Sequence, residues 1–148
     1  MLRLSKKIDY GLLAMTYIAF HDNESRVINT KEIAEEYSIP GELLAKVLQR
    51  LAKKGLILSQ NGPKGGYQLA KEPGNISVGE IVKAIEGPIQ MMECNQEDHQ
   101  CLQIEKCSVR SPLTKIQQSI SNLLDNITLE EMRCDDIIHL TFHGEGVK

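Results

Sequence analysis

Residues 41–69 read GELLAKVLQRLAKKGLILSQNGPKGGYQL, and this stretch decides the fold. Apolar residues recur every three or four positions up to Leu51, which predicts a helix over about 40–54 with one face in the core. Two short apolar segments follow at 56–60 and 67–70, and the turn between them is rich in glycine. A helix joined to such a hairpin predicts the last helix and β-wing of a winged helix-turn-helix.

Two further helices are expected before this stretch. Apolar residues at helical spacing predict the first, from Ser5 as its N-cap to about His21. The second begins at Asn29, which has capping-box spacing to Glu32, and ends near Tyr37.

The C-terminal half adds a long helix. A capping box at Ser77 and Glu80 predicts a fourth helix ending near Gly87. A later helix of about twenty residues carries an apolar seam that can pack on its own domain or on a partner helix. The seam consists of Leu113, Ile116, Ile120, Leu123 and Ile127. Another capping box, at Thr128 and Glu131, precedes a short last helix.

The fold class is therefore mainly α with a small β-wing. We expect a winged helix-turn-helix domain over 1–87, a cysteine-containing loop over 88–107, and a long helix with a tail over 108–148.

Composition narrows the classes of function. The chain has 148 residues, no Trp and 4% aromatic residues, so stacking on single-stranded nucleic acid is disfavoured. No apolar run approaches the roughly 18 residues of a membrane span, and no signal-peptide core opens the chain. We therefore expect a cytoplasmic protein that does not bind membranes. No nucleophile motif or phosphate-binding glycine loop indicates an enzyme.

The net charge of −3 conceals a strong asymmetry. Residues 1–71 hold 11 basic and 7 acidic side chains, whereas residues 72–148 hold 6 and 13. Six basic residues and no acidic one lie between Leu43 and Lys71. Such a block is either a solvated surface or the electrostatic footprint of a nucleic-acid site.

The helix over 40–54 has the division of faces that a DNA-reading helix needs. Its apolar face consists of Leu44, Val47, Leu48 and Leu51. Its outer face consists of Glu42, Ala45, Lys46, Gln49, Arg50 and Lys53. Lys46 and Gln49 are the best candidates to contact bases, and Arg50 and Lys53 to contact phosphates. On this helix alone, an ordinary basic surface helix explains the pattern equally well.

The hairpin shifts the balance towards DNA binding. Gly62, Gly65 and Gly66 allow the backbone to approach a partner, and Lys64 places a cation at the tip. The alternative is a tight hairpin whose glycines serve only the turn. Together with the acid-free basic block, the hairpin and helix favour double-stranded DNA as the ligand.

Three cysteines in the loop point to a metal site. Cys94, Cys101 and Cys107 follow the pattern C-x6-C-x5-C, which indicates ligation of a soft metal or of an iron–sulfur cluster. A zinc knuckle is less natural, because no C-x-x-C pair is present. The alternative is three unrelated thiols. Local candidates for a fourth ligand are Glu93, Glu97, Asp98, His99 and Glu105. The lone Cys134 favours burial or incidental placement over ligation.

These motifs, in this order, resemble the IscR/NsrR-type winged-helix transcription regulators. The resemblance covers nearly the whole chain. It rests on Arg3-Leu4-Ser5 with Tyr10, Ile39-Pro40, Leu48-Gln49-Arg50-Leu51, Gly55-Leu56, Gly62-Pro63-Lys64-Gly65-Gly66-Tyr67-Gln68-Leu69, Ile76-Ser77-Val78-Gly79-Glu80-Ile81 and the three cysteines.

The resemblance implies a homodimer that binds a near-palindromic operator under the control of an iron–sulfur cluster, of the two-iron or four-iron type. The cluster would be held by Cys94, Cys101 and Cys107. The residues expected to contact DNA are Ser5, Lys6, Tyr10, Ser38, Glu42, Lys46, Gln49, Arg50, Lys53, Asn61, Gly62, Pro63, Lys64 and Gly65.

The chain departs from the family pattern at two positions. Arg110, which cannot ligate iron, stands where some members use His as the fourth ligand. Asp9 matches the position from which other members donate an Asp across the dimer, although an acid there also suits the helix dipole. Asn61 replaces an Arg that many relatives insert into the minor groove. The alternative function is a regulator of the same fold that responds to a small molecule or to thiol oxidation.

Overall fold

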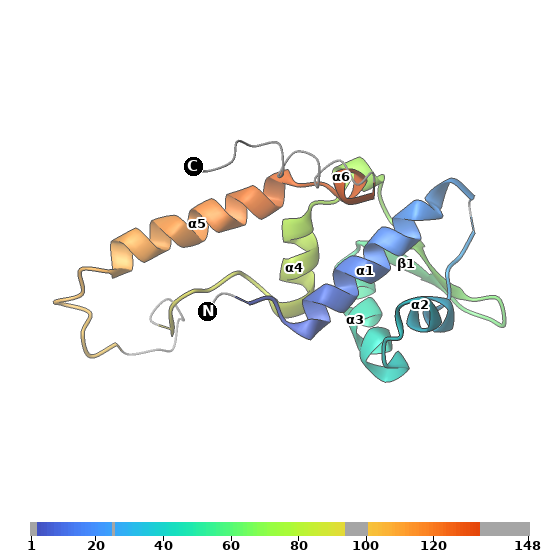
Figure 1. Ribbon diagram of the computed structural model, residues 1–148, viewed down its shortest axis with the longest axis horizontal. Helices are drawn as coiled ribbons and strands as arrows, with labels where there is room; N and C mark the ends of the chain where they lie inside the picture. Colours follow the sequence, from blue (N-terminus) through green and yellow to red (C-terminus); the bar gives the residue numbers. More distant parts are fainter. Residues whose placement is uncertain (1–2, 25, 94–100, 134–148) are drawn as a thin grey trace, which may run out of the picture.

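A computed structural model of the 148-residue chain describes residues 3–24, 26–93 and 101–133. The elements α1 to α4 and a β-hairpin form a body at one end of the molecule, and α5 projects from it towards the other end (Figure 1). Helices and the single hairpin therefore give the predicted class, mainly α with a β-wing, in the described residues.

The caps of the first two helices form as predicted. The α1 helix spans Lys6–Phe20, and the Ser5 hydroxyl oxygen accepts a hydrogen bond from the Ile8 amide at 3.3 Å. The α2 helix spans Thr30–Tyr37, and the Asn29 side chain accepts from the Glu32 amide at 2.8 Å. The reciprocal half of that capping box does not form, because the Glu32 carboxylate bonds to Arg26 and Tyr17 instead.

The α3 helix spans Gly41–Lys53 and follows a tight turn. Ser38 lies in the left-handed region at φ 52°, which allows α3 to cross α2 at the cost of about 1 kcal/mol for a residue with a Cβ. Pro40 occupies the N-cap position. All four residues predicted for the inner face, Leu44, Val47, Leu48 and Leu51, are at most 2% exposed.

The wing is a two-stranded antiparallel sheet. Strand β1 spans Ile57–Gln60 and β2 spans Gly66–Leu69, paired from Ile57 with Leu69 to Gln60 with Gly66. A bridge between Ile28 and Tyr67 joins the segment before α2 to β2, one residue from its start beside the turn. A Cβ on Gly66 would overlap the backbone of Ile28, so only glycine permits this close approach.

The α4 helix, Val78–Glu86, packs against α1, α3 and α5. Its predicted capping box is complete: Ser77 accepts from the Glu80 amide at 3.0 Å, and the Glu80 carboxylate accepts from the Ser77 amide at 2.9 Å. Ile81 and Ile85 bury their side chains in the core shared with α1 and α3. The α4 helix thereby connects the body that carries α3 and the wing with the C-terminal half.

The α5 helix spans Arg110–Asn126, somewhat shorter than the predicted twenty residues. Within α5 the predicted apolar seam ends at Leu123. Its last predicted member, Ile127, follows the helix in an extended conformation and packs against the core. None of the residues of α5 is buried, and Ile116 and Leu123 are 47% and 61% exposed. The final helix α6, Leu129–Arg133, returns to the body and buries Leu129 completely.

Candidate nucleic-acid interface and cysteine segment

The outer face of α3 is open to solvent. Glu42, Lys46, Gln49 and Lys53 are all exposed, while the inner face is anchored in the core. No side-chain hydrogen bond joins Lys46, Gln49 or Lys53 to another residue in the described part of the chain. These side chains are therefore available for base edges and phosphates.

Arg50 behaves differently from the other basic residues of α3. Its Nη1 donates a hydrogen bond of 2.6 Å to the carbonyl oxygen of Ile85, at the end of α4. Helical spacing places Arg50 on the outer face, where the residue is exposed, but this bond directs Nη1 of its guanidinium towards the end of α4. Phosphate contact by Arg50 therefore stays a prediction, and it competes with an internal partner.

The tip of the wing is exposed at every position from Asn61 to Lys64. Gly62 has φ 113°, which other residues rarely adopt, and its carbonyl accepts from the Gly65 amide at 2.9 Å. A Cβ on Gly65 would overlap the carbonyl oxygen of Gln60. The glycines thus serve the tight turn, and the same turn presents Pro63 and Lys64 outward.

A groove of about 310 Å³ separates the wing from the start of α2. Asn29 and Thr30 form one side, and Ser59, Asn61 and Gly62 contribute to the other. Thr30 and Ser59 line this groove and are not among the residues expected to contact DNA. In the sequence, the Asn29 cap indicates only that a helix begins at this point. The bridge between Ile28 and Tyr67 that brings the wing beside this helix can be recognised only in the tertiary structure.

The N-terminal residues expected to contact DNA lie at the start of α1. Lys6 is exposed and Tyr10 half-buried, and both line a cavity of about 540 Å³. Ser5 uses its hydroxyl oxygen as the α1 cap. Ser38 is exposed in the turn between α2 and α3.

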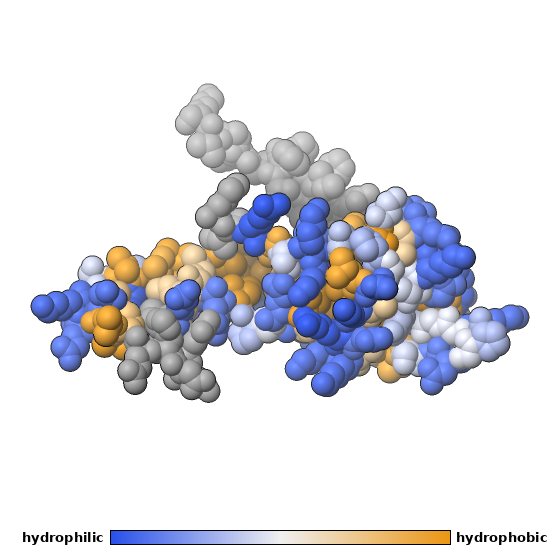
Figure 2. All heavy atoms as spheres, turned by 90° about the horizontal axis from the view of Figure 1, so that it is seen from below, coloured by the Kyte–Doolittle hydropathy of each residue, from blue (hydrophilic) through white to orange (hydrophobic). Residues whose placement is uncertain are grey.

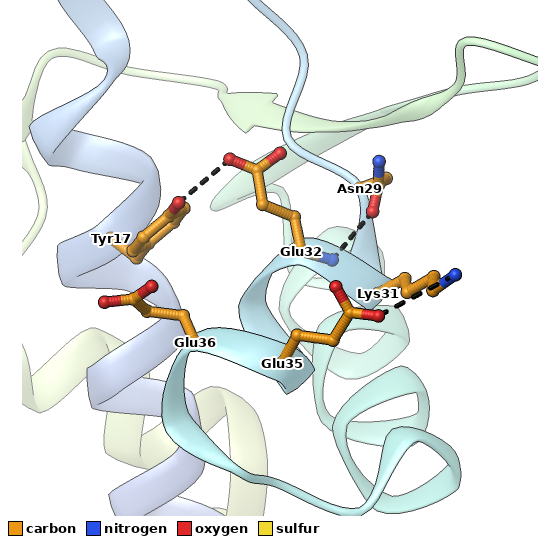
Figure 3. A pocket seen from close by; sticks show the side chains of 6 residues that line it. All are labelled: Tyr17, Asn29, Lys31, Glu32, Glu35 and Glu36. Carbon is orange, nitrogen blue, oxygen red and sulfur yellow. Dashed lines mark hydrogen bonds and ion pairs between the residues drawn. The ribbon is translucent and has the colours of Figure 1, made fainter.

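A second cavity, of about 480 Å³, is acidic (Figure 3). Glu32, Glu35 and Glu36 of α2 line it together with Tyr17 of α1. Arg26 bonds to Glu32 at 2.7 Å and holds the pKa of that carboxyl below its usual value, while burial and the 2.9 Å bond to Glu32 raise the pKa of Tyr17. Its negative charge makes this cavity unsuitable for the DNA backbone.

The cysteine segment, residues 88–107, runs from α4 to α5. Cys101 and Cys107 are half-buried free thiols, and Glu93 and Glu105 are exposed. The other cysteines and three of the suggested local ligands lie outside the described residues: Cys94, Cys134, Glu97, Asp98 and His99. Among the described residues, no three His, Cys, Asp or Glu side chains lie close enough together to hold a metal ion.

Two candidate positions for the fourth ligand, Arg110 and Asp9, lie outside this segment and within the described residues. Arg110 is the first residue of α5 and offers no ligand atom. Asp9 is exposed in the first turn of α1, where its charge also favours the helix dipole. The described residues 101–109 lead directly into the start of α5, and that end of α5 points away from the wing (Figure 1).

A family model described as Rrf2, iron-dependent transcriptional regulator, matches residues 4–135. The chain belongs to the Rrf2 family. It is similar to the HTH-type transcriptional regulator NsrR of Bacillus licheniformis, with 31% identity over 88% of this chain and 92% of that protein. The chain is therefore a transcriptional regulator of the Rrf2 family.

Solved structures agree with the family. The structure of IscR from T. potens has 33% identity and a TM-score of 0.72, covering 91% of this chain and 88% of its own. The structure of CymR, the global cysteine regulator of B. subtilis, has 31% identity and a TM-score of 0.73, covering 90% and 98%. These winged-helix neighbours confirm the predicted fold of the Rrf2 regulator. In its described residues, no helix is both long and apolar enough to cross a membrane.

Proposed function

We propose that this Rrf2 regulator is a dimer whose affinity for a near-palindromic operator is controlled by an iron–sulfur cluster. The observation that carries the proposal is the cysteine segment. Three cysteines lie within fourteen residues there, and Cys101 and Cys107 are free and half-buried. Thiolates are the usual ligands of iron–sulfur clusters, so the donor set suits this group.

The DNA-binding part uses α3 and the wing. The exposed Lys46 and Gln49 would contact base edges in the major groove, and Lys53 would contact a phosphate. Lys64 would place its charge near the backbone or in the minor groove, where Asn61 replaces the Arg of many relatives. Two such surfaces, related by a two-fold axis, match a near-palindromic site.

Exposed apolar residues on α5 support the dimer. Ile116 and Leu123 leave much of their surface in solvent, and apolar atoms gather over the projecting part of the molecule (Figure 2). A second copy that packs its own α5 against this face would remove those side chains from water.

The fourth ligand would come from the partner subunit. Cys94, Cys101 and Cys107 supply three thiolates, and the exposed Asp9 of the partner subunit would supply a carboxylate. When bound, the cluster supplies iron that reacts with oxidants and with nitric oxide. A carboxylate exchanges more readily than a thiolate, which suits a sensor that must lose its cluster.

The alternative is a regulator of this fold that answers to a small molecule or to thiol oxidation. Its support is the similarity to CymR, a cysteine regulator, together with the free thiols of Cys101 and Cys107. In this case the cysteines would act as thiols or bind zinc.

The visible spectrum of protein purified without oxygen separates the two functions. A cluster predicts a brown protein that absorbs near about 400 nm and bleaches in air or nitric oxide. Colourless protein with stoichiometric zinc, or with reversibly oxidised thiols alone, would contradict the cluster and favour the alternative.

A salt titration tests the DNA surface separately. Two subunits should release several counterions, so operator affinity should fall roughly 10³-fold or more between 50 and 200 mM salt. Lys64→Ala should weaken binding to all sequences similarly, whereas Gln49→Ala should change operator preference by about 1–3 kcal/mol. A flat salt response would count against this surface.

A further inference from the structure

Arg50 fills a position at the end of α4 that the helix itself leaves open. The last carbonyls of a helix have no amide donor within it. At the end of α4, the Gly87 amide donates to the Lys83 carbonyl, and Arg50 donates to the Ile85 carbonyl at 2.6 Å. A cation at the C-terminus of a helix is also favoured by the helix dipole. This bond joins α3 to α4 across 35 residues of sequence.

The Ile85 side chain is held where three helices meet. It is 2% exposed, and a Cβ on Gly11 of α1 would overlap its Cδ1 atom. The same Cβ would lie 3.3 Å from Cγ1 of Val47 of α3. The last turn of α4 therefore cannot shift without moving α1 or α3, because a close-packed core transmits displacement.

The chain runs from this turn directly into the cysteine segment. Gly87 ends α4 with φ 86°, and four residues later the Met91 amide donates to Oε1 of Gln117 on α5 at 2.8 Å. The α4 helix is also tied to α5 by the ion pair of Lys83 with Asp125 at 2.8 Å. The end of α4 thus joins the DNA-reading helix to the cysteine segment and to α5.

We propose that Arg50 is a positioning residue that holds α3 against the end of α4, and that it does not bind a phosphate. Its bond to Ile85 sets the orientation in which α3 meets DNA. This second step rests on the proposed function: the same bond transmits a structural change in the cysteine segment to α3.

Two variants on one helix separate positioning from phosphate binding. Arg50→Met and Lys53→Met each remove one cation from the outer part of α3. Lys53→Met should weaken operator and non-specific DNA alike and lower the salt slope by about 1 per subunit. Arg50→Met should weaken the operator about 10-fold or more, leave non-specific affinity within about 2-fold, and leave the salt slope unchanged.

The outcomes are distinct. If Arg50→Met lowers the salt slope and weakens all DNA as Lys53→Met does, Arg50 is a phosphate contact and the proposal is wrong. Unchanged operator affinity would also overturn it. If circular dichroism shows that Arg50→Met does not fold, Arg50→Lys replaces it. Lys keeps the charge without the planar fork, so operator affinity should fall several-fold, and full affinity would overturn the proposal.

The coupling has its own measurement. The ratio of operator affinities with and without the cluster should move towards 1 in Arg50→Met, while the visible spectrum of the cluster stays that of the unmodified protein. A ratio unchanged from that protein would overturn the coupling. If the unmodified protein itself shows no cluster or no such ratio, the proposed function fails, and the salt-slope result still decides the role of Arg50.

Discussion

Glu32 shows how one side chain can leave its expected role. The sequence places it where a capping box would use its carboxylate, but Arg26 and the Tyr17 hydroxyl bond to that carboxylate at 2.7 and 2.9 Å. Charged hydrogen bonds from a guanidinium are stronger than one from a backbone amide, so the Glu32 carboxylate pairs with Arg26 and does not complete the capping box. The result ties α2 to α1 and to the segment that precedes α2.

Glu32→Gln should destabilise the protein only when the carboxyl is ionised. Arg26 lowers the pKa of Glu32 from its ordinary 4.5, so the carboxylate stabilises the fold above that value and loses this effect as the pH falls through the lowered pKa. The expected loss at pH 7 is about 1 kcal/mol or less, because the pair is partly solvated. Denaturant unfolding at pH 7 and at about pH 3 measures it.

Glu35→Gln is the matched control. Glu35 lies on the same helix and forms a long, exposed ion pair of 3.7 Å with Lys31. Its substitution should change stability little at either pH. A Glu32→Gln variant that loses as much stability at low pH as at neutral pH would show that the ionised carboxylate is not the stabilising form.

At the scale of the element, α5 divides its apolar residues between two surfaces. Leu124 packs against the core of the chain, whereas Leu123, one position earlier, is 61% exposed. An apolar row on the solvent side of a projecting helix is typical of a surface that packs against another helix. This division makes Leu123 a probe of association that leaves the chain's own packing intact.

Leu123→Asp should convert the proposed dimer into a folded monomer. A charge buried at a helix–helix seam has no partner there, so we expect dimerisation to weaken at least about 100-fold. Light scattering measures the mass, and circular dichroism verifies the fold. Gln118→Asp adds the same charge at an exposed polar position of α5 and should leave the dimer intact. A dimeric Leu123→Asp protein would place the interface elsewhere.

At the scale of the whole molecule, the cysteine segment and Asp9 belong to different parts of the chain. Cys107 precedes the start of α5 by three residues, and Asp9 lies on the first turn of α1. A subunit that borrows Asp9 from its partner as a ligand would couple cluster binding to dimer geometry.

Mixed dimers made from separately tagged chains test this arrangement. A dimer of one Asp9→Ala chain and one Cys101→Ala chain should hold one cluster of normal lifetime, because all intact ligands meet across the interface. A dimer of one unmodified chain and one chain with both substitutions should hold only a short-lived cluster. Absorbance near about 400 nm over time measures both.

The converse pattern would show that Asp9 acts within its own chain. Equal, normal lifetimes in the two mixed dimers would show that Asp9 is not a ligand. In that event a local carboxylate such as Glu105 becomes the next candidate, and the coupling of the cluster to α1 of the partner has to be abandoned.

Local order in the sequence determined most of the fold. The apolar spacing of α3, the caps at Ser5, Asn29 and Ser77, and the glycine turn of the wing each depend on residues within four positions of one another. Such short-range patterns act on the backbone before any tertiary contact forms, so they can be recognised without a structure.

Only the tertiary structure determines which side chains far apart in the sequence contact each other. The guanidinium of Arg50 meets Ile85, 35 residues away, because α3 crosses the end of α4. The Tyr17 hydroxyl meets Glu32 because α2 packs beside α1, and Leu123 is exposed while Leu124 is not because α5 crosses α4 at one particular rotation. Periodicity shows which residues share a face, but the crossing of two helices selects which atoms on that face meet.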